Sequence, residues 1–190
     1  MNMILLTGPS VEPVLLSEVR EFLKVDGNVE DGLLARLIMA ARQACENFTG
    51  RKLIHQQWQV DFNDWQGTYP YGHLSLPLSP MVSVDKLEVM GSEGWMIVDP
   101  GQYLLDKSSY RGKIIPADGA CFPYPAIAVG GIRVSLTAGF ASDWNALPED
   151  LRQGIFHWIE SRYEEDSALV QKAQKNAESL WQSYRMVNLS

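Results

Sequence analysis

The stretch from Asp31 to Leu53 constrains the fold of this chain most, because it combines a long amphipathic pattern with a stop signal. One face of the expected helix is apolar, and the opposite face is polar and carries Arg36, Arg42, Gln43 and Glu46. Gly50 follows the last apolar position, where a residue in the left-handed conformation commonly ends a helix. The spacing therefore predicts a core-facing helix that ends at Gly50. Its apolar positions recur every three or four residues: Leu33, Leu34, Leu37, Ile38, Ala41, Ala44, Cys45 and Phe48.

Helical patterns also occur near both ends of the chain. Ser17 is a candidate N-cap for a first helix, which Asp26 and Gly27 would end. Pro148 suits the first turn of a later helix. Ser167 is a candidate N-cap for a last helix. The apolar positions of that last helix are Leu169, Val170, Ala173, Ala177, Leu180, Trp181 and Tyr184.

The middle of the chain has a different period. Apolar and polar residues alternate over 58–63 and 132–137, which is the pattern of a β-strand with one buried face. Between them, the glycine-flanked run 91–94 separates two apolar segments and favours a hairpin. The segment 74–78 also alternates, but Pro77 cannot donate a hydrogen bond to a neighbouring strand. We therefore expect 74–78 to be an edge strand or an extended loop.

Together these patterns predict an α+β fold made of one domain over residues 1–190. Residues 14–54 and 146–186 would form a helical body. Residues 55–140 would form a mainly antiparallel, β-rich insertion with long loops, because seven Gly and Pro residues punctuate 112–131.

The composition is that of an ordinary globular protein, with 46% hydrophobic and 21% charged residues. No basic residue precedes Arg20 and the first apolar run is short, so we expect no signal peptide. No segment approaches the roughly 20 apolar residues that span a bilayer, and we expect synthesis in the cytoplasm without membrane contact. Proteins that bind DNA contact its phosphates with Lys and Arg side chains. The formal net charge of -7 therefore argues against specific DNA binding.

The residues that carry chemistry do not form a recognisable site. Cys45 falls on an apolar helical face and Cys121 in a Pro-rich turn, and the histidines are scattered, so no zinc-ligand spacing occurs. Asp61 with Asp64 could act as an acid and base pair, and the acidic run 164–166 could bind a divalent cation. A solvated charged surface is the more frequent role of such residues. We predict no enzymatic activity, no catalytic residue, no cofactor and no metal site.

Three parts of the sequence resemble parts of a known protein family, and they occur in the same order along the chain. They are CENFTGRKL at 45–53, LSEVREFLKVD at 16–26, and the closing pair LPEDLRQGIFHWIESRYEED at 147–166 with SLWQSYRMVNL at 179–189. These segments are similar to helices of the head-tail connector (adaptor) proteins of tailed bacteriophages and prophages. The resemblance covers both ends of the chain and leaves its middle weakly matched.

The resemblance implies a structural role in a virion. Such a subunit would form a homo-oligomeric ring, twelve-fold in the virion, that joins the portal protein to tail-proximal or stopper proteins. It would reside at the head-tail junction of the virion, after assembly in the host cytoplasm. DNA would pass through the ring without specific binding, which the net charge of -7 would suit.

The end of the last helix is the candidate partner surface. Trp181, Tyr184, Arg185 and Met186 belong to residue types that are enriched at protein interfaces. The resemblance implies that C-terminal helices contact the portal protein, and the following residues 187–189 would extend that contact. The alternative is that Trp181 and Tyr184 close the core of their own subunit, which is the more frequent role of an apolar helical stripe.

Two other functions stay open at this point. The chain could be another virion component, such as a tail-completion protein. It could also be an enzyme or ligand-binding domain with a pocket in the β-rich region, near Trp65, Tyr69, Tyr71 and Trp95.

Overall fold

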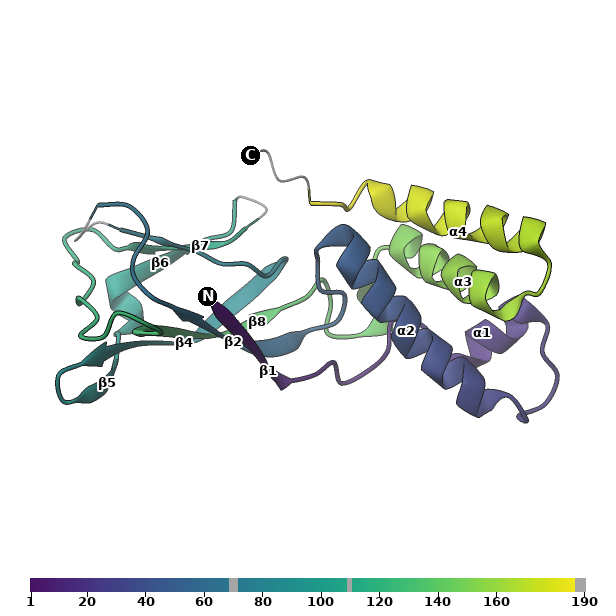
Figure 1. The fold of residues 1–190 in the computed structure, drawn as a ribbon, viewed down its shortest axis with the longest axis horizontal. Helices are drawn as coiled ribbons and strands as arrows, with labels where there is room; N and C mark the ends of the chain where they lie inside the picture. Colours follow the sequence, from purple (N-terminus) through teal and green to yellow (C-terminus); the bar gives the residue numbers. More distant parts are fainter. Residues whose placement is uncertain (69–71, 109–110, 187–190) are drawn as a thin grey trace. The chain divides into compact units, whose positions relative to one another are not determined.

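A computed structural model describes residues 1–68, 72–108 and 111–186 of the protein, and two compact units make up the chain (Figure 1). The β unit comprises Met1–Gly8 and His55–Gly139. The helical unit comprises Pro9–Ile54 and Phe140–Ser190. The α+β class predicted from the sequence is confirmed, with helices from both ends of the chain and strands from its middle. That all 190 residues form one domain stays a prediction.

An antiparallel five-stranded sheet dominates the β unit, with its strands in the order β1-β2-β8-β4-β5. The predicted alternation is confirmed in the central strand β8, where every second residue is buried. The predicted hairpin is also confirmed, with Gly91 paired to Gly94 at its tip. The strands are β1 (Asn2–Thr7), β2 (Gln56–Phe62), β8 (Ile132–Ala138), β4 (Met81–Gly91) and β5 (Gly94–Ile97).

A second, smaller sheet has the order β3-β7-β6 and is also antiparallel. Its first strand ends before Pro77, and it lies at an edge of the sheet, as the proline predicts. Side chains of both sheets join one apolar cluster, which is the core of the unit. The elements are β3 (Leu74–Ser75), β6 (Tyr103–Asp106) and β7 (Lys113–Pro116), with a short 3-10 helix η1 (Pro100–Gln102).

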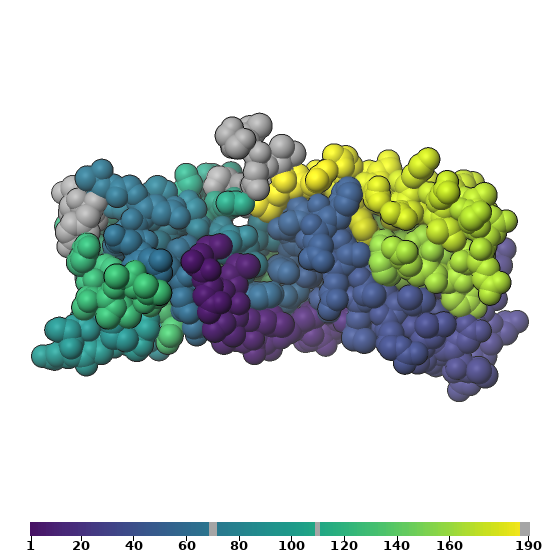
Figure 2. Space-filling view, viewed as in Figure 1, coloured from purple at the N-terminus to yellow at the C-terminus, as the bar shows by residue number. Residues whose placement is uncertain are grey.

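Strand β1 was not predicted from the sequence. It pairs with β2, and all six of its residues are exposed, so no alternation of buried and exposed positions marks it as a strand. Four consecutive apolar residues, Met3 to Leu6, therefore lie on the surface of the β unit, as the purple atoms in Figure 2 show. This strand forms one edge of the five-stranded sheet.

The helical unit contains four helices over its described residues, and their apolar faces meet in a second core. From the long helix, Leu34, Ile38, Ala41 and Cys45 are buried, as the spacing predicts, whereas Leu33 is exposed. The elements are α1 (Leu16–Leu23), α2 (Asp31–Thr49), α3 (Glu149–Tyr163) and α4 (Ser167–Gln182), with a short 3-10 helix η2 (Trp144–Ala146) before α3.

The helix ends differ in part from the predictions. Gly50 ends α2 with a φ of 72°, as predicted. Ser17 does not cap α1: the Glu18 carboxylate reaches back and accepts the backbone N–H of Leu15 at 2.8 Å. Ser167 does not cap α4 either, because the preceding Asp166 accepts the N–H groups of the first turn. In both places a carboxylate, which is the stronger acceptor at the positive end of a helix, replaces the hydroxyl.

Two charged residues of the polar face of α2 are buried. The Arg42 guanidinium donates to Glu12 at 2.8 Å and lies 3.7 Å from Glu46. The Glu46 carboxylate in turn accepts from the Lys52 ammonium at 3.0 Å and from the backbone N–H of Leu53 at 3.2 Å. The side chains of Arg42 and Glu46 are only 11% and 4% exposed. This network therefore ties α2 to the segments before α1 and after its own end.

Candidate assembly surfaces

Trp181 closes the contact between the last two helices. Its side chain is 1% exposed, and its indole N–H donates to the carbonyl oxygen of Leu151 at 3.2 Å. The indole lies on Gly154 of α3, where a methyl group would fall 2.1 Å from Nε1. Phe48 of α2 contributes a further aromatic contact, with ring centroids 6.0 Å apart. Trp181 thus belongs to the core of its own subunit in the isolated chain.

The residues after Trp181 lie against the end of α2. Tyr184 meets Phe140 edge to face at 5.9 Å, and burial and the nearby Asp150 raise the pKa of its phenol, with Arg51 acting in the opposite sense. The Arg185 guanidinium lies 5.3 Å from the centre of the Phe48 ring.

Met186 donates its backbone N–H to Thr49 at 2.8 Å and packs over Gly50. Arg185 is exposed, whereas Tyr184 and Met186 are half-buried. The end of α4 is thus held by several contacts and still presents a surface. The partner role of Trp181, Tyr184, Arg185 and Met186 stays a prediction, and residues 187–189 lie outside the described part of the chain.

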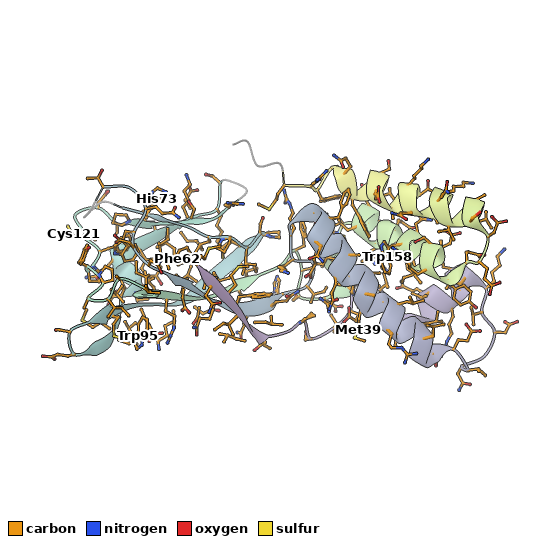
Figure 3. All side chains as sticks on the ribbon, viewed as in Figure 1. Met39, Phe62, His73, Trp95, Cys121 and Trp158 are labelled. Carbon is orange, nitrogen blue, oxygen red and sulfur yellow. The ribbon has the colours of Figure 1, made fainter. Side chains whose placement is uncertain are left out.

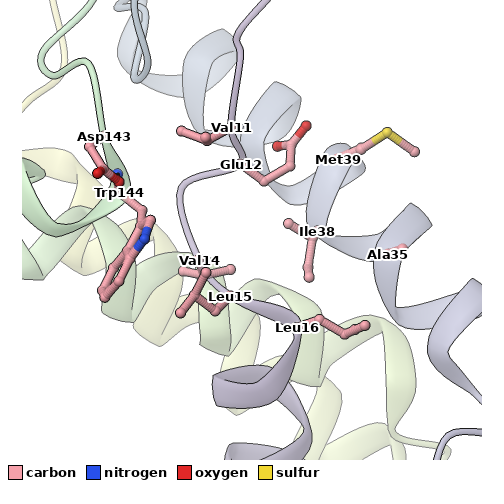
Figure 4. A pocket seen from close by; sticks show the side chains of 10 residues that line it. All are labelled: Val11, Glu12, Val14, Leu15, Leu16, Ala35, Ile38, Met39, Asp143 and Trp144. Atoms are coloured by element: carbon pink, nitrogen blue, oxygen red, sulfur yellow. The ribbon is translucent and has the colours of Figure 1, made fainter.

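An apolar groove lies near the start of α1 and was not predicted. Figure 4 shows Val14, Leu16 and Ile38 facing into it and Trp144 at one side. Its volume is about 550 Å³, and the exposed Leu15 and Met39 extend its apolar surface. The other lining residues are Val11, Glu12, Ala35 and Asp143.

Exposed apolar side chains of the β unit gather at two places, and sequence reasoning missed both. One is β1 and the other is the β4-β5 hairpin with the loop before β8. The loop is joined to the hairpin by a hydrogen bond from Ala126 to Met90 at 2.7 Å. Trp95 lies on this hairpin (Figure 3). The guanidinium carbon of Arg133 lies over its ring, 4.2 Å from the centre of the Trp95 ring. The exposed large hydrophobic residues of the hairpin and loop are Met96, Ile97, Tyr124, Ile127 and Val129.

The carboxylates that could have formed a catalytic pair have structural partners. Asp61 is 3.3 Å from the Arg133 guanidinium, and Asp64 accepts the N–H of Trp65. Within the described residues, no three His, Cys, Asp or Glu side chains are placed to hold a metal ion, and this includes the acidic run 164–166.

The two thiols differ sharply in their surroundings. Cys45 is fully buried, and burial and the adjacent Glu46 raise its thiol pKa far above the ordinary value. Cys121 is exposed in the loop before β8 and forms no disulfide (Figure 3). A buried neutral thiol is a poor nucleophile, so Cys45 acts as a small core residue.

The alternative ligand pocket near Trp65 and Trp95 does not form around those indoles. Trp65 stacks on Phe122 with ring centroids 4.0 Å apart and donates its indole N–H to Pro123 at 2.9 Å. A hollow of about 340 Å³ lies nearby, but neither indole lines it. Tyr69 and Tyr71 lie outside the described residues. None of the helices that the structure describes has the length and apolar character to cross a membrane.

Residues 14–89 match the sequence model of the phage gp6-like head-tail connector proteins. This stretch contains the two N-terminal segments that carry the family resemblance, whereas the closing helices lie beyond it. Over its whole length, the chain is similar to a chain in the neck of an empty GTA particle computed with C6 symmetry. The two chains share 24% sequence identity, and their structures match with a TM-score of 0.77. The match covers 100% of this chain and 98% of that chain. The chain is therefore similar to head-tail connector proteins over residues 14–89, and to a GTA neck chain over its whole length.

Two further solved structures resemble this chain at 26% sequence identity, again covering 100% of it and 98% of the other chain. One is a chain of the virion of a native gene transfer agent (GTA) particle, with a TM-score of 0.75. The other is in the neck of a native GTA particle computed with C12 symmetry, with a TM-score of 0.72. No curated protein sequence matches this chain. The predicted resemblance to head-tail connector proteins is confirmed over residues 14–89, and the similar solved chains come from the neck or virion of GTA particles.

Proposed function

We propose that this protein is a head-tail connector, a structural subunit of the neck of a phage-like particle, where identical copies form a closed ring of twelve. The observation that carries the proposal is the likeness over the whole chain to the neck chain of a native GTA particle computed with C12 symmetry. A closed ring needs two different adhesive surfaces on each copy. The exposed apolar residues of β1 and of the β4-β5 hairpin supply two such candidates.

The ring would join the portal protein on one side to tail-proximal or stopper proteins on the other. We assign the portal contact to the end of α4, where Arg185 is exposed and Tyr184 and Met186 are half-buried. Trp181 would position this end from the core through its contact with α3. An excess of carboxylates over basic residues, with a net charge of -7, suits a ring through which DNA slides without specific binding.

No chemical step is part of this proposal. The Arg133 contact of Asp61 and the burial of Cys45 both support a structural role for residues that could otherwise react. Assembly would take place in the host cytoplasm, and the final location would be the head-tail junction of the particle.

The test is binding to the portal protein encoded with this connector. Arg185→Glu reverses the charge at the exposed end of α4, and we expect it to weaken co-purification with the portal at least tenfold. Lys172→Glu makes the same charge change at an exposed position within α4 and is the matched control. Equal binding by the wild type and both variants would remove the end of α4 from the interface. An electron microscopy class average of the complex without rotational symmetry would refute the ring.

A further inference from the structure

Strand β1 has an edge that soluble proteins normally protect. A free sheet edge offers unpaired N–H and C=O groups, and proteins cover it or place charged residues, Pro or bulges along it. Residues 2–7 include no charged residue and no proline. The single irregularity in the β1-β2 pairing falls between Leu5 and Thr7, so the regular part from Asn2 to Leu5 is left ready to pair.

The opposite edge of the same sheet has the same character. Strand β5 is Gly94–Ile97 and carries no charge. Met96 is 46% exposed and Ile97 is 65% exposed. On the described part of the β unit, all exposed large hydrophobic side chains except Leu104 lie in one of two places. The first is β1 with the preceding Met1, and the second is the β4-β5 hairpin with the loop before β8. The side chains at these two places are Met1, Met3, Ile4, Leu5, Leu6, Met96, Ile97, Tyr124, Ile127 and Val129.

We propose that β1 of one copy pairs with β5 of the next copy, so that the five-stranded sheet continues from subunit to subunit. The proposal rests on the ring proposed above and names its subunit contact. Two different edges at opposite ends of one sheet provide the two unlike surfaces that a head-to-tail ring requires. Pairing of β1 with β1 of a second copy would instead close a two-fold dimer and leave β5 uncovered.

The sheet topology fixes the direction of this pairing. Each of the four neighbouring strand pairs from β1 to β5 is antiparallel, so β1 and β5 point the same way within one subunit. Rotation about a ring axis preserves the direction of strands that run along that axis. The contact between β5 and the β1 of the next copy is therefore parallel. A four-residue ladder is small beside the roughly 800 Å² that each partner buries in a stable interface, so the apolar side chains of the loop at Ile127 and Val129 add area.

The first experiment places one charge on each edge. Ile4→Lys and Ile97→Lys change exposed side chains, and a lysine on an edge strand opposes the addition of another strand while leaving the subunit fold intact. Val29→Lys is the matched control, because Val29 is 94% exposed in the helical unit. Ring formation is measured by mass photometry, with and without the portal protein. We expect each edge variant to reduce the assembled fraction at least tenfold and the control to leave it unchanged.

The outcomes separate this inference from the proposed function. If the wild type forms rings and both edge variants form them equally well, the strand pairing is wrong and the ring stands. If the wild type forms no ring with or without the portal, both fail. Circular dichroism of each variant verifies that the subunit is folded.

A second experiment identifies the partner edge in a Cys121→Ser background, which removes the exposed native thiol. Ile4→Cys together with Ile97→Cys should give a ladder of disulfide-linked oligomers under mild oxidation, because each copy then carries one thiol at each edge. Ile4→Cys alone should remain uncrosslinked. Efficient dimers from Ile4→Cys alone would establish the β1-β1 pairing and overturn the proposal.

Discussion

Replacing Gly154 by alanine should destabilise the helical unit, although the same change usually stabilises a helix. Gly154 lies inside α3, and a methyl group there would fall 2.1 Å from Nε1, 2.6 Å from Cδ1 and 2.8 Å from Cε2 of Trp181. The indole is 1% exposed and cannot move toward solvent without opening the contact between α3 and α4. It would also lose its 3.2 Å hydrogen bond to Leu151.

Opposing contributions set the size of the effect. Alanine gains about 1 kcal/mol over glycine in helix propensity. Overpacking a core costs about 1–3 kcal/mol, and a buried N–H left without its acceptor costs about 1–3 kcal/mol more. These contributions sum to a loss of about 1–5 kcal/mol in the free energy of unfolding, and we expect the middle of that range, about 3 kcal/mol. For a chain of this length, about 3 kcal/mol corresponds to about 6–12 °C in the melting temperature.

Urea unfolding of the intact chain, followed by circular dichroism, measures this loss. Gly32→Ala is the matched control, because the nearest atom to its new methyl group is Arg36 Nη1 at 3.9 Å. We expect that control to be neutral or stabilising by up to about 1 kcal/mol. The double variant Gly154→Ala with Trp181→Leu should lose less than the sum of the two single changes. A Gly154→Ala protein as stable as the wild type would refute the reasoning about this contact.

Four further predictions concern charge and reactivity. Arg42→Ala should lower the free energy of unfolding by about 3 kcal/mol in urea titrations, because it removes a partner from a buried ion pair. Lys86→Ala, at a pair with an exposed lysine, should lower it by about 0.5 kcal/mol or less. A thiol reagent should modify only Cys121 in the folded protein, with Cys45 reacting on unfolding; two fast thiols would contradict the burial of Cys45. Burial raises the pKa of the Tyr184 phenol, so the free energy of unfolding should fall as the pH rises from about 10 through the pKa of the folded state. Tyr184→Phe should lessen this fall, which unfolding titrations at pH 9 and 10.5 measure.

The sequence predicts those helices and strands that have one buried, apolar face and one exposed, polar face. Helix α2, strand β8 and the β4-β5 hairpin each bury one face, so their apolar period is visible along the chain. Strand β1 is exposed on both faces and has no such period. We propose that its surface apolar residues form part of a contact between copies of the chain.

Other features were missed because they depend on residues far apart in the sequence. Burial of Arg42 requires Glu12, which is 30 residues away, and no helical pattern of α2 alone reveals that partner. The position of Trp181 depends in the same way on Gly154 of a different helix. The sequence therefore identified the end of α4 as a candidate surface, but it could not divide that surface into buried and exposed residues.

Each of the two units is assembled from separate pieces of the chain, and this affects the order of events during synthesis. The chain enters the helical unit after Gly8, returns to the β unit at His55 and leaves it again after Gly139. The strand β1 pairs with β2, which is itself held by β8 near residue 132, so this edge cannot exist in its final form until about two thirds of the protein has been made. If neighbouring copies add to this edge, as proposed above, assembly has to wait until the chain has been made through β8.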